Sequence, residues 1–353
     1  MRPGPVWLWL AGSLMGAAPA AAAEPAPLPA ALTQPALISP RALHALTLDV
    51  AHAGTRLVGV GEHGIVLLSD DGGSHWRQAA SVPVSVTLTA VRFGSASEGW
   101  AVGHMGVILH TTDAGETWQR QIDGIEVAAL VRKQAEALAD PKEVAAADQL
   151  LADGPDKPFL DLAVTPRSVL AVGAYGIAVR STDGGQSWSV ASDVGDKQGL
   201  HLYGLSSAGD IELLAGEQGF LAQSTKGGTF QPIQLPESVT LFGALALPDG
   251  VRLAFGLGGR VVRAAAGEET WAPVPTGRSG AVTCAVVLPN GHVLIGTNTG
   301  ELALGDAGGR NFEVLHGGPP IPIAAMLVDG TNMIFSSPFG PVPVALEYLD
   351  PDL

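Results

Sequence analysis

The segment Val60-Gly-Glu-His-Gly-Ile-Val-Leu-Leu-Ser-Asp-Asp-Gly-Gly-Ser-His-Trp76 recurs twice more in the chain with few changes. The two copies are Val102-Gly-His-Met-Gly-Val-Ile-Leu-His-Thr-Thr-Asp-Ala-Gly-Glu-Thr-Trp118 and Val172-Gly-Ala-Tyr-Gly-Ile-Ala-Val-Arg-Ser-Thr-Asp-Gly-Gly-Gln-Ser-Trp188. Weaker copies keep an aromatic side chain at the final position, in Phe230, Trp271 and Phe312. Self-similarity at a fixed period is the sequence signature of repeat architectures, so this repeat decides the fold.

The spacing of the aromatic positions predicts the number of repeats. Successive positions are 42, 70, 42, 41 and 41 residues apart, and the long interval equals one 41-residue period plus an insertion of 29 residues. One further period after Phe312 reaches Leu353, so seven units fit. Alternating apolar and polar residues predict four strands in the second unit, at 88–93, 99–102, 107–110 and 118–121. The sequence therefore predicts an all-β, seven-bladed β-propeller with a helical insertion between blades 2 and 3.

Each of the three best copies contains the pattern Ser/Thr-x-Asp-x-Gly-x-x-Trp, known as the Asp box. We expect a hairpin turn in which the aspartate caps backbone amides, the glycine takes a positive φ, and the tryptophan packs between blades. The residues concerned are Asp71, Gly73, Trp76, Asp113, Gly115, Trp118, Asp183, Gly185 and Trp188. The pattern predicts fold rather than chemistry, since such turns also occur in proteins that are not enzymes.

The insertion, at about 125–156, is the only convincing helical segment of the sequence. Apolar residues recur at three- and four-residue spacing from Val127 to Leu138, and a second run follows Pro141. This pattern predicts a helical hairpin broken at Asp140-Pro141. Two interpretations of its apolar stripe stay open: it closes the hairpin on itself or on the propeller, or it docks a partner.

The insertion lies in a link between blades, and these links share a face with the turns between second and third strands. We expect this face, called here the insertion-bearing face, to bind the partner. Its candidate residues are Glu62, His63, His104, Met105, Tyr175, Glu217 and Gln218 of the turns, with Leu130 and Leu138 of the insertion.

The N-terminus has the features of an export signal. A basic Arg2 precedes the apolar run 6–15, and small residues at Ala20–Ala23 suit cleavage, which predicts a signal peptide at 1–23. An uncleaved membrane anchor is the alternative. Residues 24–42 form an N-terminal segment in which 36–38 are predicted to complete the seventh blade as a ring-closing strand, and the propeller is expected at 43–353.

The composition argues against several kinds of partner and chemistry. The net charge of −15 disfavours nucleic acid and anionic lipid. The single cysteine, Cys284, is expected to be a buried strand residue, and no cofactor is predicted. Glu62 and Glu217 could act as acid and base over the channel, although solvated turn residues are the simpler interpretation. His63, His104 and Met105 suggest a surface metal site but provide no clear third ligand, so no metal and no catalytic residue is assigned.

The repeat, with its Val-Gly-x-x-Gly-x-Ile and Asp-Gly-Gly-x-x-Trp motifs, resembles that of the Ycf48/Hcf136-like propellers, the photosystem II assembly-factor group, over most of residues 43–320. The stretch Gly154-Pro-Asp-Lys-Pro-Phe-Leu-Asp161 is similar to a bacterial branch associated with RND-superfamily exporters. This resemblance implies a non-catalytic, extracytoplasmic or periplasmic protein that assembles, stabilises or assists a membrane-protein complex. The resemblance to the bacterial branch implies an RND transporter as the partner. After signal cleavage we expect a soluble monomer.

A glycan-binding protein or a sialidase-like glycoside hydrolase is the alternative, because Asp boxes also occur there. A resemblance to sialidases implies a tyrosine that acts as the nucleophile and three arginines that bind the carboxylate of the sugar. The chain has 3 tyrosines, and its arginines show no such triad spacing.

Overall fold

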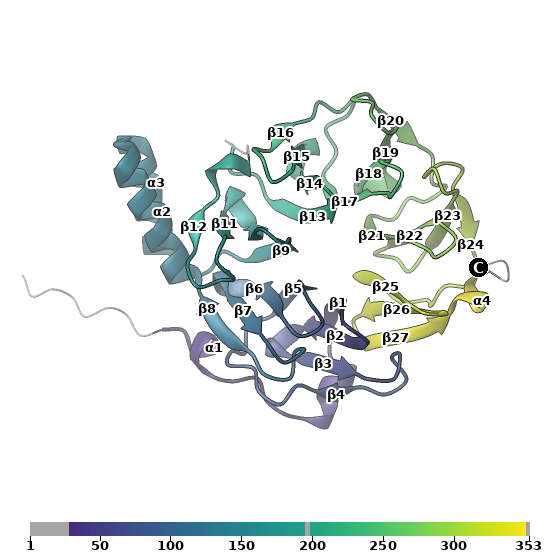
Figure 1. Ribbon diagram of the computed structural model, residues 1–353, viewed down its shortest axis with the longest axis horizontal. Coiled ribbons are helices and arrows are strands. Elements are labelled where there is room, and N and C mark those ends of the chain that lie inside the picture. Colours follow the sequence, from purple (N-terminus) through teal and green to yellow (C-terminus); the bar gives the residue numbers. More distant parts are fainter. Residues whose placement is uncertain (1–27, 195–197, 351–353) are drawn as a thin grey trace, which may run out of the picture.

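The computed structural model describes residues 28–194 and 198–350. The expected signal peptide at 1–23 lies outside the described residues. In Figure 1 seven antiparallel sheets surround a central axis in chain order, and each is one blade of a propeller. The predicted all-β fold with seven blades is therefore confirmed.

The strands of each blade follow one another from the axis to the rim. Blade 1 contains β1 (Thr47–Ala53), β2 (Arg56–Gly61), β3 (Val66–Ser69) and β4 (Arg77–Gln78). Blade 2 contains β5 (Leu88–Phe93), β6 (Gly99–Gly103), β7 (Ile108–Thr111) and β8 (Gln119–Ile122). Blade 3 contains β9 (Phe159–Val164), β10 (Val169–Gly173), β11 (Ala178–Ser181) and β12 (Ser189–Val190). Blade 4 contains β13 (Leu202–Ala208), β14 (Ile211–Gly216), β15 (Leu221–Thr225) and β16 (Gln231–Pro232).

The remaining blades have the same order of strands. Blade 5 contains β17 (Leu241–Ala246), β18 (Arg252–Gly256), β19 (Val261–Ala264) and β20 (Trp271–Val274). Blade 6 contains β21 (Val282–Val287), β22 (Val293–Thr297), β23 (Leu302–Gly305) and β24 (Glu313–Leu315). Blade 7 contains only β25 (Ala325–Asp329), β26 (Asn332–Ser337) and β27 (Gly340–Ala345) among the described residues.

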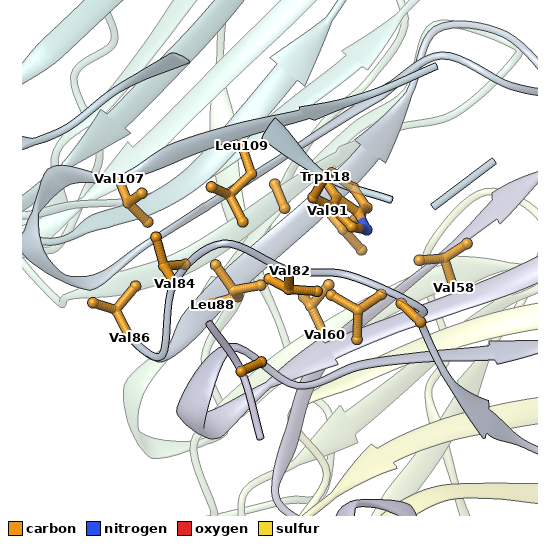
Figure 2. Packing of buried hydrophobic residues seen from close by; sticks show 14 of the residues in the cluster. Val58, Val60, Val82, Val84, Val86, Leu88, Val91, Val107, Leu109 and Trp118 are labelled. Carbon is orange, nitrogen blue, oxygen red and sulfur yellow. The ribbon is translucent and has the colours of Figure 1, made fainter. Parts of the chain in front are cut away.

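The hydrophobic core lies between neighbouring blades rather than within one sheet. Figure 2 shows Val58 and Val60 of blade 1 packed against Val91, Leu109 and Trp118 of blade 2, all of them buried. The second strands of blades 2, 3, 5 and 6 are buried along their whole length, because both faces of a middle strand contact a neighbouring blade. Aliphatic and aromatic burial of this kind contributes about 25 cal/mol per Å² of apolar area.

The ring closes by contacts between blade 7 and β1. The Thr47 hydroxyl lies 3.3 Å from the Ser337 carbonyl oxygen and accepts a hydrogen bond from the Ser337 N–H at 3.1 Å. The His52 Nε2 atom lies 3.0 Å from the Val328 carbonyl oxygen. These contacts join the first and last blades without a shared sheet.

The predicted ring-closing strand at 36–38 is wrong. This segment lies against blade 1 instead, where the Ala36 N–H donates to the Val82 carbonyl at 3.0 Å and the Gln78 amide donates to the Leu37 carbonyl at 2.9 Å. Pro341 and Pro343 remove two backbone donors from β27, and proline is confined to the edges of sheets. A fourth strand therefore has no regular ladder to join.

The insertion forms two helices between β8 and β9, α2 (Gly124–Leu138) and α3 (Pro141–Asp153). Asp123 and Glu126 form a capping box at the start of α2. Ala139 ends it in the left-handed conformation, with a φ of 53°. Asp140 caps α3, whose first residue is Pro141, so the break lies where the sequence predicts it. Two short helices, α1 (Ala30–Thr33) and α4 (Leu346–Leu349), lie near the ends of the described chain.

No helix among the residues that the structure describes is both long enough and apolar enough to cross a membrane.

Candidate functional site

The turns between second and third strands have the same backbone geometry in blades 1–5. Each is a three-residue turn: η2 (Glu62–Gly64), η3 (His104–Gly106), η4 (Ala174–Gly176), η6 (Glu217–Gly219) and η7 (Leu257–Gly259). The middle residue of each is left-handed, with φ between 53° and 66° at His63, Met105, Tyr175, Gln218 and Gly258. Such a φ costs about 1–2 kcal/mol for a non-glycine residue. Four blades therefore hold a side chain at a backbone position that glycine would occupy more easily.

Glu62 and Glu217 have a structural role in these turns. The Glu62 carboxylate accepts the Leu46 N–H at 3.0 Å, and the Glu217 carboxylate accepts the His201 N–H at 2.8 Å. Leu46 and His201 each immediately precede the inner strand of their blade. Asn298 has the same role in blade 6, where its side-chain oxygen accepts the Ala281 N–H at 2.9 Å. Each side chain thus ties a turn to the start of its innermost strand.

The two histidines considered as metal ligands occupy different positions of their turns. His63 is the middle residue of η2, whereas His104 is the first residue of η3, and Met105 is the residue equivalent to His63. Among the described parts of the chain, no three histidine, cysteine, aspartate or glutamate side chains gather as ligands of one metal ion.

The insertion begins at the insertion-bearing face beside η3, as expected. Gly124, its first helical residue, lies so close to Gly106 of η3 that a Cβ atom at Gly106 would be 2.6 Å from the Cα atom of Gly124. From there, Figure 1 shows α2 and α3 extending outward past the rim near β12, rather than covering the face. The insertion thus begins at this face, but its two helices lie beside the propeller for most of their length. The turns of the other blades stay uncovered by it.

The apolar stripe of the insertion is divided among three environments. Val127 is buried and Leu130 is half-buried, both against the core between blades 2 and 3. Ala135 and Ala147 are buried along the hairpin. Leu138, at the tip, is 64% exposed. Most of the stripe thus closes the hairpin on itself and on the propeller, and the tip offers a small apolar surface.

A run of rings crosses the insertion-bearing face from blade 3 to blade 5. Tyr175 contacts His201 with ring centroids 4.8 Å apart, His201 contacts Tyr203 at 6.1 Å, and Tyr203 contacts Phe242 at 5.3 Å. Each pair is edge-to-face, a favoured geometry for aromatic rings. We call these four residues the aromatic row. Sequence reasoning identified only Tyr175 of the four.

The row is held by polar contacts at its centre. The Tyr175 N–H donates to Nδ1 of His201 at 3.1 Å, so the neutral imidazole carries its proton on Nε2. The Glu217 carboxylate accepts a hydrogen bond from the backbone N–H of His201 and also lies 3.7 Å from Nδ1 of its ring. Burial, together with the nearby charge of Glu217, raises the pKa of the Tyr203 phenol, so the tyrosine is neutral under physiological conditions.

The Asp boxes lie at the turns between third and fourth strands, on the opposite face. The carboxylates of Asp71, Asp113 and Asp183 each accept the N–H of the residue four positions later, at 2.8–2.9 Å. Gly73, Gly115 and Gly185 have φ between 83° and 86°. Hydrogen bonds from His75 and from Ser187 lower the pKa values of Asp71 and Asp183 to about 2.

The tryptophans of the boxes differ in one contact. Trp76 and Trp118 donate from Nε1 to the carbonyls of Gly73 and Gly115, at 3.0 and 2.9 Å. The buried Nε1 of Trp188 has no hydrogen-bond partner among the described residues. The third box is therefore less completely bonded than the first two.

Three charged side chains link the inner strands of blades 1, 2 and 3. The Arg92 guanidinium in β5 binds the carboxylate of Asp49 in β1 and that of Asp161 in β9, the latter at 3.0 Å. Asp161 is mostly buried, and burial raises the pKa of its carboxyl group despite the opposing charge of Arg92. Every oxygen of the two carboxylates also accepts a hydrogen bond from a backbone N–H. The cluster thus has satisfied partners and no free reactive group.

These features define a seven-bladed β-propeller with an outward-pointing helical hairpin and a turn face that residues 28–194 and 198–350 leave uncovered. Residues 41–136 match the family model described as "Photosynthesis system II assembly factor YCF48". The chain is 27% identical over 175 residues to the photosystem II assembly lipoprotein Ycf48 of Synechococcus sp. (strain CC9902), a match that covers 48% of this chain and 43% of that relative. The resemblance to the Ycf48-like family is confirmed by these two matches.

Solved structures share the fold at low sequence identity. One, described as YCF48 bound to D1 peptide, has a TM-score of 0.64 at 20% identity and covers 86% of this chain and 94% of its own. YCF48 from Cyanidioschyzon merolae has a TM-score of 0.59 at 15% identity, covering 86% of this chain and 97% of its own. The GH74 enzyme of Niastella koreensis has a TM-score of 0.61 at 14% identity, covering 88% of this chain and 53% of its own. At these identities the likeness concerns the fold.

Proposed function

We propose that this protein is a non-catalytic binding platform that assists the assembly or stability of a membrane-protein complex outside the cytoplasm. The observation that carries the proposal is the insertion-bearing face, which the described part of the chain leaves open and at whose surface Tyr175 is 59% exposed. Similarity to a family of assembly factors supports the same role. The export signal expected at residues 1–23 agrees with a periplasmic or otherwise extracytoplasmic location.

A catalytic role has little support in the polar groups of this face. Glu62 and Glu217, the two carboxylates considered as acid and base, are both engaged in holding turns. Arg92, in the inner strands, is bound by two carboxylates, so it is not available to bind an anionic sugar. The glycosidase alternative therefore rests on Asp boxes and on a fold shared with a GH74 enzyme.

The finer proposal names an RND-superfamily exporter as the membrane partner. It is based on the resemblance of residues 154–161 to the branch associated with such transporters. Because Leu138 is exposed at the tip of the hairpin, we expect the insertion to contribute contacts in addition to those of the turns.

The test is co-purification from crosslinked membranes with the wild-type protein and with a shortened hairpin. The Arg132 guanidinium lies 2.5 Å from the Asp148 carboxylate, so residues 133–147 can be replaced by a short glycine linker between facing positions. This deletion keeps Val127 and Leu130 in the core between blades 2 and 3. We expect an integral membrane protein, an RND transporter in the finer proposal, to co-purify with the wild type and to be reduced with the shortened hairpin.

Recovery of only non-membrane proteins would contradict the proposed function. Equal recovery of the transporter with both forms would contradict the contribution of the hairpin. Glycosidase activity on sialylated substrates by the purified protein would favour the alternative.

A further inference from the structure

The aromatic row is continuous with a groove on the rim side of blade 4. The groove has a volume of about 550 Å³ and is lined by Gln218, Phe220, Pro232, Ile233, Leu235 and Glu237, among others. The turn η6 connects the two, since Glu217 contacts His201 of the row and Gln218 lines the groove. Leu200, which precedes His201, also lines the groove. We call this surface the blade 4 groove.

The chemistry of the groove suits a polypeptide backbone with apolar side chains. Phe220, Ile233 and Leu235 are half-buried, so each exposes part of its apolar surface to the groove. Gln218 is exposed, and a primary amide both donates and accepts hydrogen bonds, as a peptide group does. The aromatic row adds ring edges and faces that pack well against aliphatic and proline side chains.

The shape of the combined surface indicates an extended ligand. It runs from the groove at the rim of blade 4, past η6, to Phe242 on the inner strand of blade 5. An extended chain covers about 3.3 Å per residue, so its successive side chains reach along such a path without folding back.

The charges around this surface select a basic segment over an acidic one. Lys157, whose ammonium lies 5.2 Å from the Tyr175 ring, is paired with Asp156 at 2.5 Å and with Asp153 at 3.1 Å. Arg260 is paired with Glu237 at 2.6 Å. The cations beside the row and the groove are thus neutralised, and the net charge of the chain is −15. Lys157 has two acidic partners and Glu217 lies beside the row, so a positively charged ligand is favoured over an acidic one.

We propose that the aromatic row and the blade 4 groove together bind an extended, apolar polypeptide segment that carries lysine or arginine. The proposal rests on the proposed function, because it names the part of the partner that the platform recognises. It places the binding energy in blades 3–5 rather than in the helical hairpin.

In the test, a displayed library of random twelve-residue peptides is selected for binding to the purified protein. The affinity of each selected peptide is then measured by fluorescence anisotropy. We expect sequences rich in apolar and basic residues. Tyr175→Ala removes an exposed ring and Gln218→Lys adds positive charge to the groove, so each should weaken binding about tenfold, the effect of about 1.4 kcal/mol. Two matched controls, Tyr348→Ala at another exposed tyrosine and Gln186→Lys on the Asp-box face, should leave affinity within about twofold.

Selection of acidic peptides, selection of none, or equal effects of the variants and their controls would overturn this site. Membrane co-purification with the same Tyr175→Ala and Gln218→Lys proteins separates the two proposals. If co-purification persists while peptide binding fails the test, the site is wrong and the proposed function stands. If the wild-type protein recovers no membrane protein, the proposed function itself fails.

Discussion

Asp161 in β9 ties blade 3 to blade 4 through one carboxylate oxygen, which accepts the Leu205 N–H in β13 at 2.8 Å. Asp49 makes the equivalent contact from blade 1 to blade 2, where it accepts the Val91 N–H at 2.9 Å. Blade 2 has Ala90 at the corresponding position and instead supplies Arg92, which binds both aspartates. Three consecutive blades are thus joined at their inner strands by charge as well as by apolar packing.

Replacing Arg92 by methionine should destabilise the propeller strongly. The change leaves two mostly buried carboxylates without their counter-ion, and breaking a buried pair typically costs about 3–5 kcal/mol. Because the Arg92 side chain is 35% exposed, solvent screening should reduce the loss to about 2–3 kcal/mol. Urea unfolding followed by tryptophan fluorescence measures it, with Arg41→Met at an exposed position as the control. Equal midpoints for the two variants would contradict the structural role of the cluster.

The Asp boxes should make stability depend on pH in the acid range. Hydrogen bonding lowers the pKa values of Asp71 and Asp183 to about 2 in the folded protein, below the ordinary value of 3.8. A lowered folded pKa contributes stability that is fully present above about pH 4 and is lost as the pH falls toward 2. We expect Asp183→Asn to flatten this part of the stability curve, whereas Asp210→Asn, at an exposed position, should follow the wild type. A wild-type curve that is flat between pH 4 and 2 would count against this account.

Trp118 and Trp188 form a natural comparison for the Nε1 hydrogen bond of the Asp box. Replacement by phenylalanine removes a bond to the Gly115 carbonyl at Trp118, but removes no such bond among the described residues at Trp188. We therefore expect Trp118→Phe to lose about 1 kcal/mol more stability than Trp188→Phe. Thermal unfolding of both variants measures the difference, and an equal loss would show that ring packing alone sets the cost.

The thiol of Cys284 should be inert in the folded protein. Burial raises its pKa to about 12, so almost no thiolate exists near neutral pH. We expect a disulfide reagent such as dithionitrobenzoate to react with the thiol only after denaturant is added at pH 8. Stoichiometric reaction within minutes without denaturant would contradict this placement of the side chain.

The periodic features of the molecule are visible in the sequence because each repeat encodes its own local structure. The four strands predicted in blade 2 lie within one residue of β5, β6, β7 and β8, and the helix break falls at Pro141. The ring-closing prediction fails because it assigned the short apolar run 36–38 to the open edge of blade 7, where the prolines of β27 leave no regular ladder to join. The direction of the hairpin depends on how α2 packs beside β12, which its own periodicity does not encode.

The candidate site was only partly predictable for a related reason. Tyr175 follows from the repeat, since it occupies the turn position shared with Met105 and Gln218. Its contact with His201 joins residues from two blades, and no pattern within a single repeat contains that information. One signal in the sequence does point to the row: Tyr203 and Phe242 are aromatic residues at the same repeat position, in β13 and β17.

The account is tested most directly by photo-crosslinking from single positions on the two faces. A photo-reactive amino acid at Tyr175 reports on the insertion-bearing face, and the same residue at Gln186, exposed in the Asp-box turn of the same blade, reports on the opposite face. We predict that position 175 crosslinks an integral membrane protein in intact membranes and that position 186 does not. Equal crosslinking from both positions, or none to a membrane protein from position 175, would contradict a platform that binds through this face.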